Sequence, residues 1–127
     1  MRIIGHGIDV VSVAAIKSFL ESRETRWEEK VYSVAERSNA DAPPIHSRYY
    51  AGRFAGKEAV AKAMGTGFAG DVTWRGIEIL RRENGQPYVE LKGEVLEFAN
   101  TCGITQWLIS ITHCGDTTTA SVIALGD

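Results

Sequence analysis

The chain has 127 residues, of which 44% are hydrophobic and 24% are charged, and its formal net charge at pH 7 is −2. This length and apolar content predict one globular domain over residues 1–127, with a hydrophobic core of its own. The sequence has neither a broad excess of basic residues nor an apolar run of membrane-spanning length. We therefore expect no nucleic-acid partner and no membrane association.

The charges are nonetheless unevenly distributed along the chain. Between residues 43 and 67, Glu58 is the single acidic residue, and it stands against four basic residues: Arg48, Arg53, Lys57 and Lys62. A local basic excess of this kind suits a small anionic ligand better than a long polyanion.

The cysteines and the amino terminus indicate the compartment. Cys102 and Cys114 lack metal-ligand spacing, and two free thiols in a reducing cytoplasm are the simplest interpretation. The apolar first residues are interrupted by His6 and Asp9, with no small-residue cleavage site after them, so we expect no signal peptide. The sequence therefore predicts a cytoplasmic protein.

The first element, residues 2–11, alternates in polarity and is rich in β-branched residues, which predicts a strand. Gly5, Gly7 and Asp9 would share one face of this strand. Glycine is tolerated in strands where a ligand or another backbone approaches closely. Two explanations stay open: the glycines clear a strip for a ligand that ends at Asp9, or they make room for a packed helix while Asp9 caps the next helix.

Two helix starts follow the strand. Ser12 is a plausible N-cap for a helix whose apolar residues recur with a period near 3.6. Ser33 and Glu36 have the spacing of a capping box, which predicts a short second helix. Residues 39–45 contain two prolines and are expected to form a loop.

Residues 46–64 predict a long helix that ends at Gly65, the usual residue for a left-handed C-terminal cap. Glu58, Lys62 and Gly65 would line one face of this helix. A solvated Glu–Lys surface pair, contributing about 0.2–0.5 kcal/mol, is the alternative explanation. Small neighbours favour a site instead, because they let another segment come close; these are Ala55, Ala59, Ala61 and Ala63.

The second half predicts mostly strands. Residues 73–82 and 86–91 flank Asn84-Gly85, which suits a hairpin with a type I′ turn. A helix over residues 94–102 should end at Gly103. Two further strands, over residues 106–112 and 119–125, should flank a turn at residues 114–117. The order β-α-α-α-β-β-α-β-β predicts an α+β fold with a largely antiparallel sheet packed against the long helix.

Five motifs in this chain, in order, resemble those of the holo-acyl-carrier-protein synthases, members of the 4′-phosphopantetheinyl transferase superfamily. The motifs are Gly7-Ile8-Asp9, the helical stretch Arg53–Gly65, Trp74–Ile79, Asn84–Pro87 and Ser110–His113. The resemblance runs from about Ile3 to Ala124, which is nearly the whole chain.

The resemblance implies transfer of the phosphopantetheine arm of coenzyme A to a serine of apo-acyl carrier protein, in support of fatty acid biosynthesis. Adenosine 3′,5′-bisphosphate would be released. Because attack on the β-phosphorus builds up negative charge, catalysis is mainly positioning and charge compensation. Mg²⁺ suits this chemistry since it takes hard oxygen ligands.

The resemblance also assigns roles to residues. Asp9 and Glu58 match the family's two metal ligands, and Lys62 would offset the charge of the pyrophosphate, with backbone N–H groups from Gly65 onward beside it. The general base could be Glu58 itself or a metal-activated water. Arg53 and His113 are candidates for the 3′-phosphate and adenosine end. His113 could instead be a packed, hydrogen-bonded histidine, since it shares a strand face with Ile109 and Ile111.

For assembly, the resemblance implies a homotrimer with the coenzyme site between neighbouring subunits. Acyl carrier proteins are acidic around the modified serine, so basic residues should form the docking surface. If the first helix continues far enough, Arg23, Arg26 and Lys30 form one basic stripe with Trp27 as an apolar anchor. The alternative is a mixed, solvated helix, because four glutamates surround these residues.

Three features depart from the family pattern. Ala15 stands where an arginine that meets the carrier is frequent, Thr118 where a small alanine is frequent, and the loop over residues 39–45 is not recognisably of the family.

Two rival functions stay open: a non-catalytic module that binds coenzyme A or a carrier protein, and a small metal-dependent nucleotide hydrolase.

Overall fold

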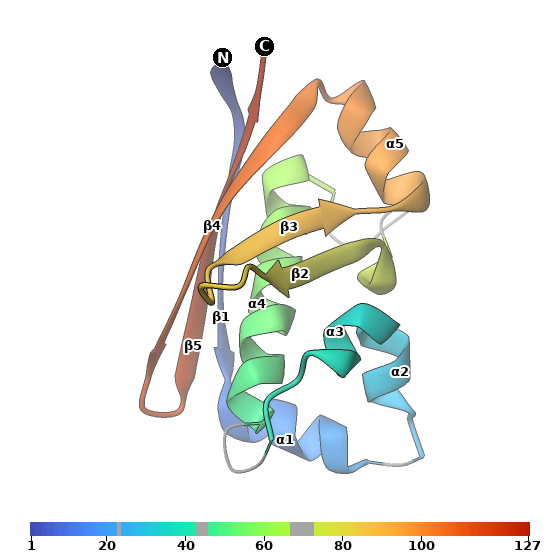
Figure 1. The fold of residues 1–127 in the computed structure, drawn as a ribbon, viewed down its shortest axis with the longest axis vertical. Helices are drawn as coiled ribbons and strands as arrows, with labels where there is room; N and C mark the ends of the chain where they lie inside the picture. The colour runs from blue at the N-terminus through green and yellow to red at the C-terminus, as the bar shows by residue number, and fades with distance from the viewer. Residues whose placement is uncertain (23, 43–45, 67–72) are drawn as a thin grey trace.

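The computed structural model of the protein describes residues 1–22, 24–42, 46–66 and 73–127 (Figure 1). In chain order the elements are β1 (Arg2–Ser12), α1 (Val13–Glu21), α2 (Trp27–Val31), α3 (Val34–Ser38), α4 (His46–Met64), the 3₁₀-helix η1 (Trp74–Gly76), β2 (Ile77–Arg81), β3 (Pro87–Leu91), α5 (Gly93–Thr101), β4 (Ile104–Cys114) and β5 (Thr117–Gly126). The predicted α+β fold, with antiparallel strands packed against a long helix, is confirmed.

A three-stranded antiparallel sheet forms one layer, with β5 in the centre between β1 and β4. Figure 1 shows the two chain ends side by side, because the first and last strands pair along their length. Helix α4 lies across one face of this sheet, and β2 and β3 form a separate two-stranded sheet beside it. Small side chains fill the contact between α4 and β5, namely Ala55, Ala59, Ala63, Ala120, Val122 and Ala124.

The glycines of β1 allow the strand to pack closely against α4. A Cβ atom placed on Gly5 or Gly7 would lie 1.9 Å from the carbonyl oxygen of Ala63 or Ala59, respectively. Because helix backbone already fills the space beside both glycines, the idea of a strip cleared for a ligand is wrong. The packed-helix explanation is confirmed.

The hydrogen bonds at the start of α1 come from two parts of the chain. As predicted, the Ser12 hydroxyl accepts a hydrogen bond from the Ala15 N–H at 3.2 Å. Asp116, in the turn between β4 and β5, accepts from the Ala14 N–H at 2.9 Å and from the Ser12 hydroxyl at 2.5 Å. Asp9 does not provide this cap, which corrects the second half of the packed-helix explanation.

The segment after α1 differs from the prediction. Helix α1 ends at Glu21, and Arg26 has a φ of 50°, which interrupts the helical path before the separate helix α2. A single continuous helix carrying Arg26 and Lys30 on one face is therefore wrong. Arg23 lies outside the described residues.

Other local predictions are confirmed, with two exceptions in the β2–β3 hairpin. The Ser33–Glu36 capping box is formed at α3, and Gly103 follows α5 with a φ of 79°. The β2–β3 hairpin exists, but β2 begins only after η1. The turn is not type I′, because Gly85 has a φ of 90° and Asn84 is not at positive φ. The Asn84 side chain instead accepts a hydrogen bond from the Gln86 N–H at 3.0 Å.

Within the part of the chain that the structure describes, no helix has the length and apolar character needed to cross a membrane. Cys102 and Cys114 are both free, as predicted.

Candidate functional site

Three charged side chains meet where β1 runs under the C-terminal half of α4. The ammonium group of Lys62 donates hydrogen bonds to Oδ1 of Asp9 at 3.0 Å and to the Ile8 carbonyl oxygen at 2.9 Å. Glu58 lies one turn before Lys62 on α4. Its pKa is raised above the usual range, first by burial and then by the Asp9 carboxylate, while Lys62 lowers it. Asp9, Glu58 and Lys62 are hereafter the acidic cluster.

The acidic cluster fits a hard divalent cation. Two partly buried carboxylates lie close enough to repel each other, which is the arrangement that a bound cation relieves. Among the described residues no three or more His, Cys, Asp or Glu side chains are arranged to hold a metal. Two protein carboxylates, with the other ligands supplied by waters and substrate phosphates, are the usual provision for Mg²⁺.

Gly65 lies just beyond the acidic cluster. It has a φ of 79° and follows the last turn of α4, as expected for a helix that ends there. It is exposed, and a Cβ atom placed on it would meet nothing within 4 Å. The Gly67 end of the predicted Gly-Thr-Gly turn lies outside the described residues.

A second group of residues lines a cavity of about 300 Å³ on the other side of α4. Its walls come from α4, the β2–β3 hairpin and β4, and its lining residues are Asp41, Arg48, Tyr49, Arg53, Arg81, Gly85, Pro87, Ile111 and His113. We call it the arginine cavity, because its three arginines face a single carboxylate among the lining residues. Such a cavity is suited to an anionic group.

Arg53 and His113, the two residues predicted for the coenzyme's 3′-phosphate and adenosine end, both line the arginine cavity. Arg53 is 7% exposed, donates from Nε to the Ile79 carbonyl oxygen at 3.3 Å, and lies 4.3 Å above the Tyr49 ring. Nδ1 of His113 is 2.8 Å from the Thr118 hydroxyl oxygen. The pKa of His113 is lowered by burial and then by Arg48 and Arg53. His113 is thus hydrogen-bonded and cavity-lining at once.

The acidic cluster and the arginine cavity are not brought together within one chain. Asp9 of β1 and Ile111 of β4 are both partners of Ala120 in β5, so they occupy one row of the sheet with a strand between them. Helix α4 lies over this row, and a helix is about 10 Å across. The two groups of predicted site residues therefore flank α4 on opposite sides.

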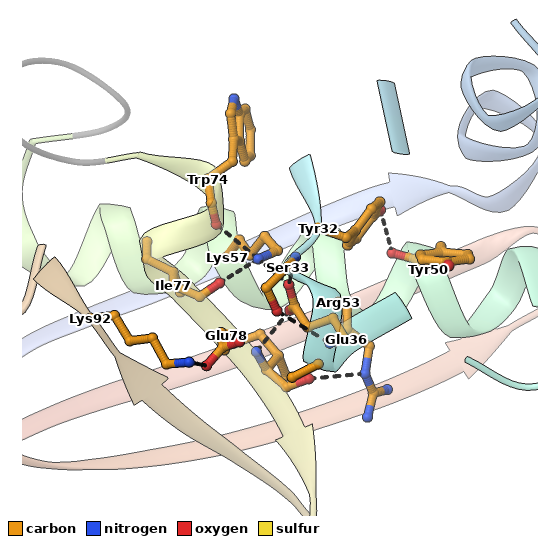
Figure 2. Close-up of polar contacts among 12 residues, drawn as sticks. Tyr32, Ser33, Glu36, Tyr50, Arg53, Lys57, Trp74, Ile77, Glu78 and Lys92 are labelled. Atoms are coloured by element: carbon orange, nitrogen blue, oxygen red, sulfur yellow. Dashed lines mark hydrogen bonds and ion pairs between the residues drawn. The ribbon is translucent and has the colours of Figure 1, made fainter. Parts of the chain in front are cut away.

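Lys57, another of the basic residues between residues 43 and 67, contributes to neither site. Figure 2 shows its polar contacts with Glu36, Trp74 and Ile77. Lys57 is fully buried and donates to Oε1 of Glu36 at 2.6 Å, to the Trp74 carbonyl oxygen at 2.8 Å and to the Ile77 carbonyl oxygen. Glu36 also accepts from the Ile79 N–H at 2.9 Å. Lys57 ties α4 to α3, η1 and β2, so it is not available to a phosphate.

The residues predicted for carrier docking are dispersed. Arg26 is exposed and pairs with Glu29 at 2.5 Å, and Lys30 is exposed in α2. Trp27 is only partly exposed, because its ring stacks on Phe19 and also contacts Tyr32 and Phe54. Its ring contacts pack α2 against α1 and α4, and its part in carrier docking stays a prediction.

Comparison with known proteins gives consistent results. The sequence model of one protein family, the 4′-phosphopantetheinyl transferase superfamily, matches residues 5–115 of this chain. The holo-[acyl-carrier-protein] synthase of Natranaerobius thermophilus is 39% identical over 125 residues, which cover 98% of this chain and 99% of that protein. The crystal structure of the Neisseria meningitidis holo-[acyl-carrier-protein] synthase aligns with a TM-score of 0.87 and 31% identity, covering 98% and 99% of the two chains. The Helicobacter pylori synthase, solved in complex with coenzyme A, aligns with a TM-score of 0.83 and 27% identity, covering 94% and 99%.

Proposed function

Because this chain belongs to the holo-[acyl-carrier-protein] synthases of the 4′-phosphopantetheinyl transferase superfamily, we propose that its two charged sites bind coenzyme A for Mg²⁺-dependent transfer. The phosphopantetheine arm passes to a serine of apo-acyl carrier protein, and adenosine 3′,5′-bisphosphate is released. The convergence of Asp9, Glu58 and Lys62 from separate elements is the observation that carries this proposal.

The reaction forms one bond and breaks another at the same phosphorus atom. The carrier serine oxygen bonds to the β-phosphorus, its proton passes to a general base (Glu58 or a water), and the bridging oxygen of the pyrophosphate departs with adenosine 3′,5′-bisphosphate. Asp9 and Glu58 would hold Mg²⁺, which when bound supplies positive charge to the pyrophosphate oxygens. Lys62 adds a fixed cation beside it, since its ammonium group is half-exposed and already lies at the cluster.

We further propose that the coenzyme site is shared between subunits of a homotrimer. The acidic cluster suits the pyrophosphate and the arginine cavity suits the 3′-phosphate, but α4 separates the two within one chain. The sheet face turned away from α4 also carries exposed apolar side chains, 48–68% exposed, which a neighbouring copy would cover; they are Ile3, Ile8, Val10 and Leu108.

The proposal also covers where the carrier docks, in which compartment the reaction takes place and which biosynthesis it serves. The carrier would dock near α1 and α2, where Arg26 and Lys30 are exposed and Ala15 presents no charge. Two free thiols agree with a reducing cytoplasm, and modified acyl carrier protein would serve fatty acid biosynthesis.

One assay tests the function and separates the alternatives. Purified protein is mixed with coenzyme A, Mg²⁺ and apo-acyl carrier protein, and the intact mass of the carrier is followed. We expect a gain of one phosphopantetheine group that stops when EDTA is added. Binding without any mass gain would mean a non-catalytic module, and coenzyme A breakdown without a carrier would mean a hydrolase.

A further inference from the structure

Thr118 and His113 face each other across the β4–β5 hairpin. They are Cα partners in the antiparallel register, and the Thr118 hydroxyl oxygen lies 2.8 Å from Nδ1 of His113. Thr118 is fully buried, whereas His113 is exposed and lines the arginine cavity. No other hydrogen bond joins the His113 ring to a described residue, so Nε2, on the far side of the ring, stays available to a ligand.

The direction of this hydrogen bond decides what His113 can offer. A neutral imidazole carries one N–H, and its other nitrogen is an acceptor. Phosphate oxygens at neutral pH mainly accept hydrogen bonds, so His113 is useful to an anionic group only when the proton lies on Nε2. If the Thr118 hydroxyl donates to Nδ1, the proton of the neutral ring must lie on Nε2.

The arginines around His113 favour a neutral ring, so the tautomer of that ring decides whether it can donate a hydrogen bond to an anion. Arg48 and Arg53 face it from α4, and Arg81 and Asp41 complete the charged lining of the cavity. Burial and then these first two arginines lower the pKa of His113, which favours the neutral ring. A neutral ring without a fixed partner would divide its proton between the two nitrogens and would present an acceptor to the anion part of the time.

We propose that Thr118 is a positioning residue for His113, whose hydroxyl donates to Nδ1 and thereby keeps the ring proton on Nε2 for the anionic end of the nucleotide. The identity of that nucleotide rests on the proposed function. The tautomer itself can be measured on the free protein.

The test compares Thr118→Val, which keeps the shape but loses the hydroxyl, with Thr118→Ser, which keeps the hydroxyl. The chain has three histidines, so long-range ¹H–¹⁵N spectra of the imidazoles are simple, and His113→Gln identifies the signals of His113. We expect the Nε2–H form in the natural protein and in Thr118→Ser, and a mixture in Thr118→Val. Calorimetry should show the dissociation constant for adenosine 3′,5′-bisphosphate raised about 3- to 10-fold in Thr118→Val and within about twofold in Thr118→Ser.

A double-variant cycle separates positioning from a packing role. The effect of Thr118→Val on affinity should disappear when His113 is already glutamine, whereas a packing defect would persist. An Nδ1–H ring in the natural protein, or unchanged affinity in Thr118→Val, would overturn the proposal. If the natural protein shows the Nε2–H form but does not bind adenosine 3′,5′-bisphosphate, the proposed function and the ligand half of this inference fail together, while the tautomer assignment stands.

Discussion

Among single residues, Asp9 interacts with both other members of the acidic cluster. Its carboxylate accepts a hydrogen bond from Lys62 and raises the pKa of Glu58. In the free protein, Lys62 balances part of this negative charge; a bound divalent cation would take over that role and leave the ammonium group to a phosphate. If Mg²⁺ binds here as proposed, its binding would therefore be coupled to the release of Lys62.

If Asp9 and Glu58 hold the cation, replacing either carboxylate by an uncharged amide of the same shape should strongly lower activity. Asp9→Asn and Glu58→Gln should each lower the rate of transfer by about 10²–10³-fold, because an amide does not balance a divalent cation. The rate is measured by carrier mass, and Mg²⁺ binding by calorimetry. Glu97→Gln, on the exposed face of α5, is the matched control and should leave both unchanged. Near-normal activity of either site variant at moderate Mg²⁺ would show that the metal assignment is wrong.

The lowered pKa of His113 predicts a pH dependence. In the folded protein the ring takes up its proton at a lower pH than the unfolded value near 6.5, so folding stability falls as the pH drops below about 6.5. A bound anion should favour the protonated ring and raise this pKa. Titration of the His113 ring by NMR, with and without adenosine 3′,5′-bisphosphate, should show the upward shift. A pKa that does not move on binding would mean that the anion does not contact His113.

At the scale of elements, α4 divides its polar residues among three neighbours. Glu58 and Lys62 lie beside β1, Arg53 bonds to β2, and Lys57 enters a buried network with α3. Helix α4 is therefore held in place by polar contacts as well as by the packing of its apolar side chains. Lys57 and Glu36 are the centre of these contacts (Figure 2).

Removing one member of this buried pair should be costly. Lys57→Met leaves the Glu36 carboxylate buried without its cation and is expected to destabilise the fold by about 3–5 kcal/mol. Adding Glu36→Gln removes the stranded charge, so the double variant should lose less than the sum of the single changes in urea denaturation. The exposed Arg26–Glu29 pair is the control, and the same changes there should cost less than about 1 kcal/mol. Additive effects of the two core changes would contradict this account.

At the scale of the whole molecule, one chain carries two charged groups of residues, which we propose as the two halves of a shared site. The acidic cluster and the arginine cavity lie on opposite sides of α4, and the outer sheet face leaves apolar side chains exposed. A shared site predicts that two differently inactivated chains repair each other.

This complementation can be measured directly. Asp9→Asn is combined with a second variant, Arg48→Ala/His113→Ala, in which both altered residues are exposed. Each variant alone should have little activity, but co-refolded mixtures should regain a substantial fraction, because some interfaces then pair an intact acidic cluster with an intact arginine cavity. Light scattering should give the mass of a trimer. An active monomer, or mixtures without recovery, would place the whole site in one chain.

Much of the local structure could be predicted from the sequence. Ser12, the Ser33–Glu36 capping box and Gly103 each act within a few residues, so their spacing alone identified helix ends. Asp9, Glu58 and Lys62 were predicted through motifs, and the structure brings them together. The type I′ turn was wrong because Gly85 alone takes positive φ.

The sequence by itself thus determined the fold class, the caps and the residues of the acidic cluster. Only the tertiary structure decided that Gly5 and Gly7 meet helix backbone, that Lys57 is buried with Glu36, and that Thr118 pairs with His113. The physical reason is how far apart in the sequence the interacting residues lie. A cap is formed by residues three or four apart, whereas the Lys57–Glu36 contact joins residues 21 apart and the Lys62–Asp9 contact joins residues 53 apart. Which side of α4 meets which strand depends on the packing of whole surfaces, and that information is distributed over the entire chain.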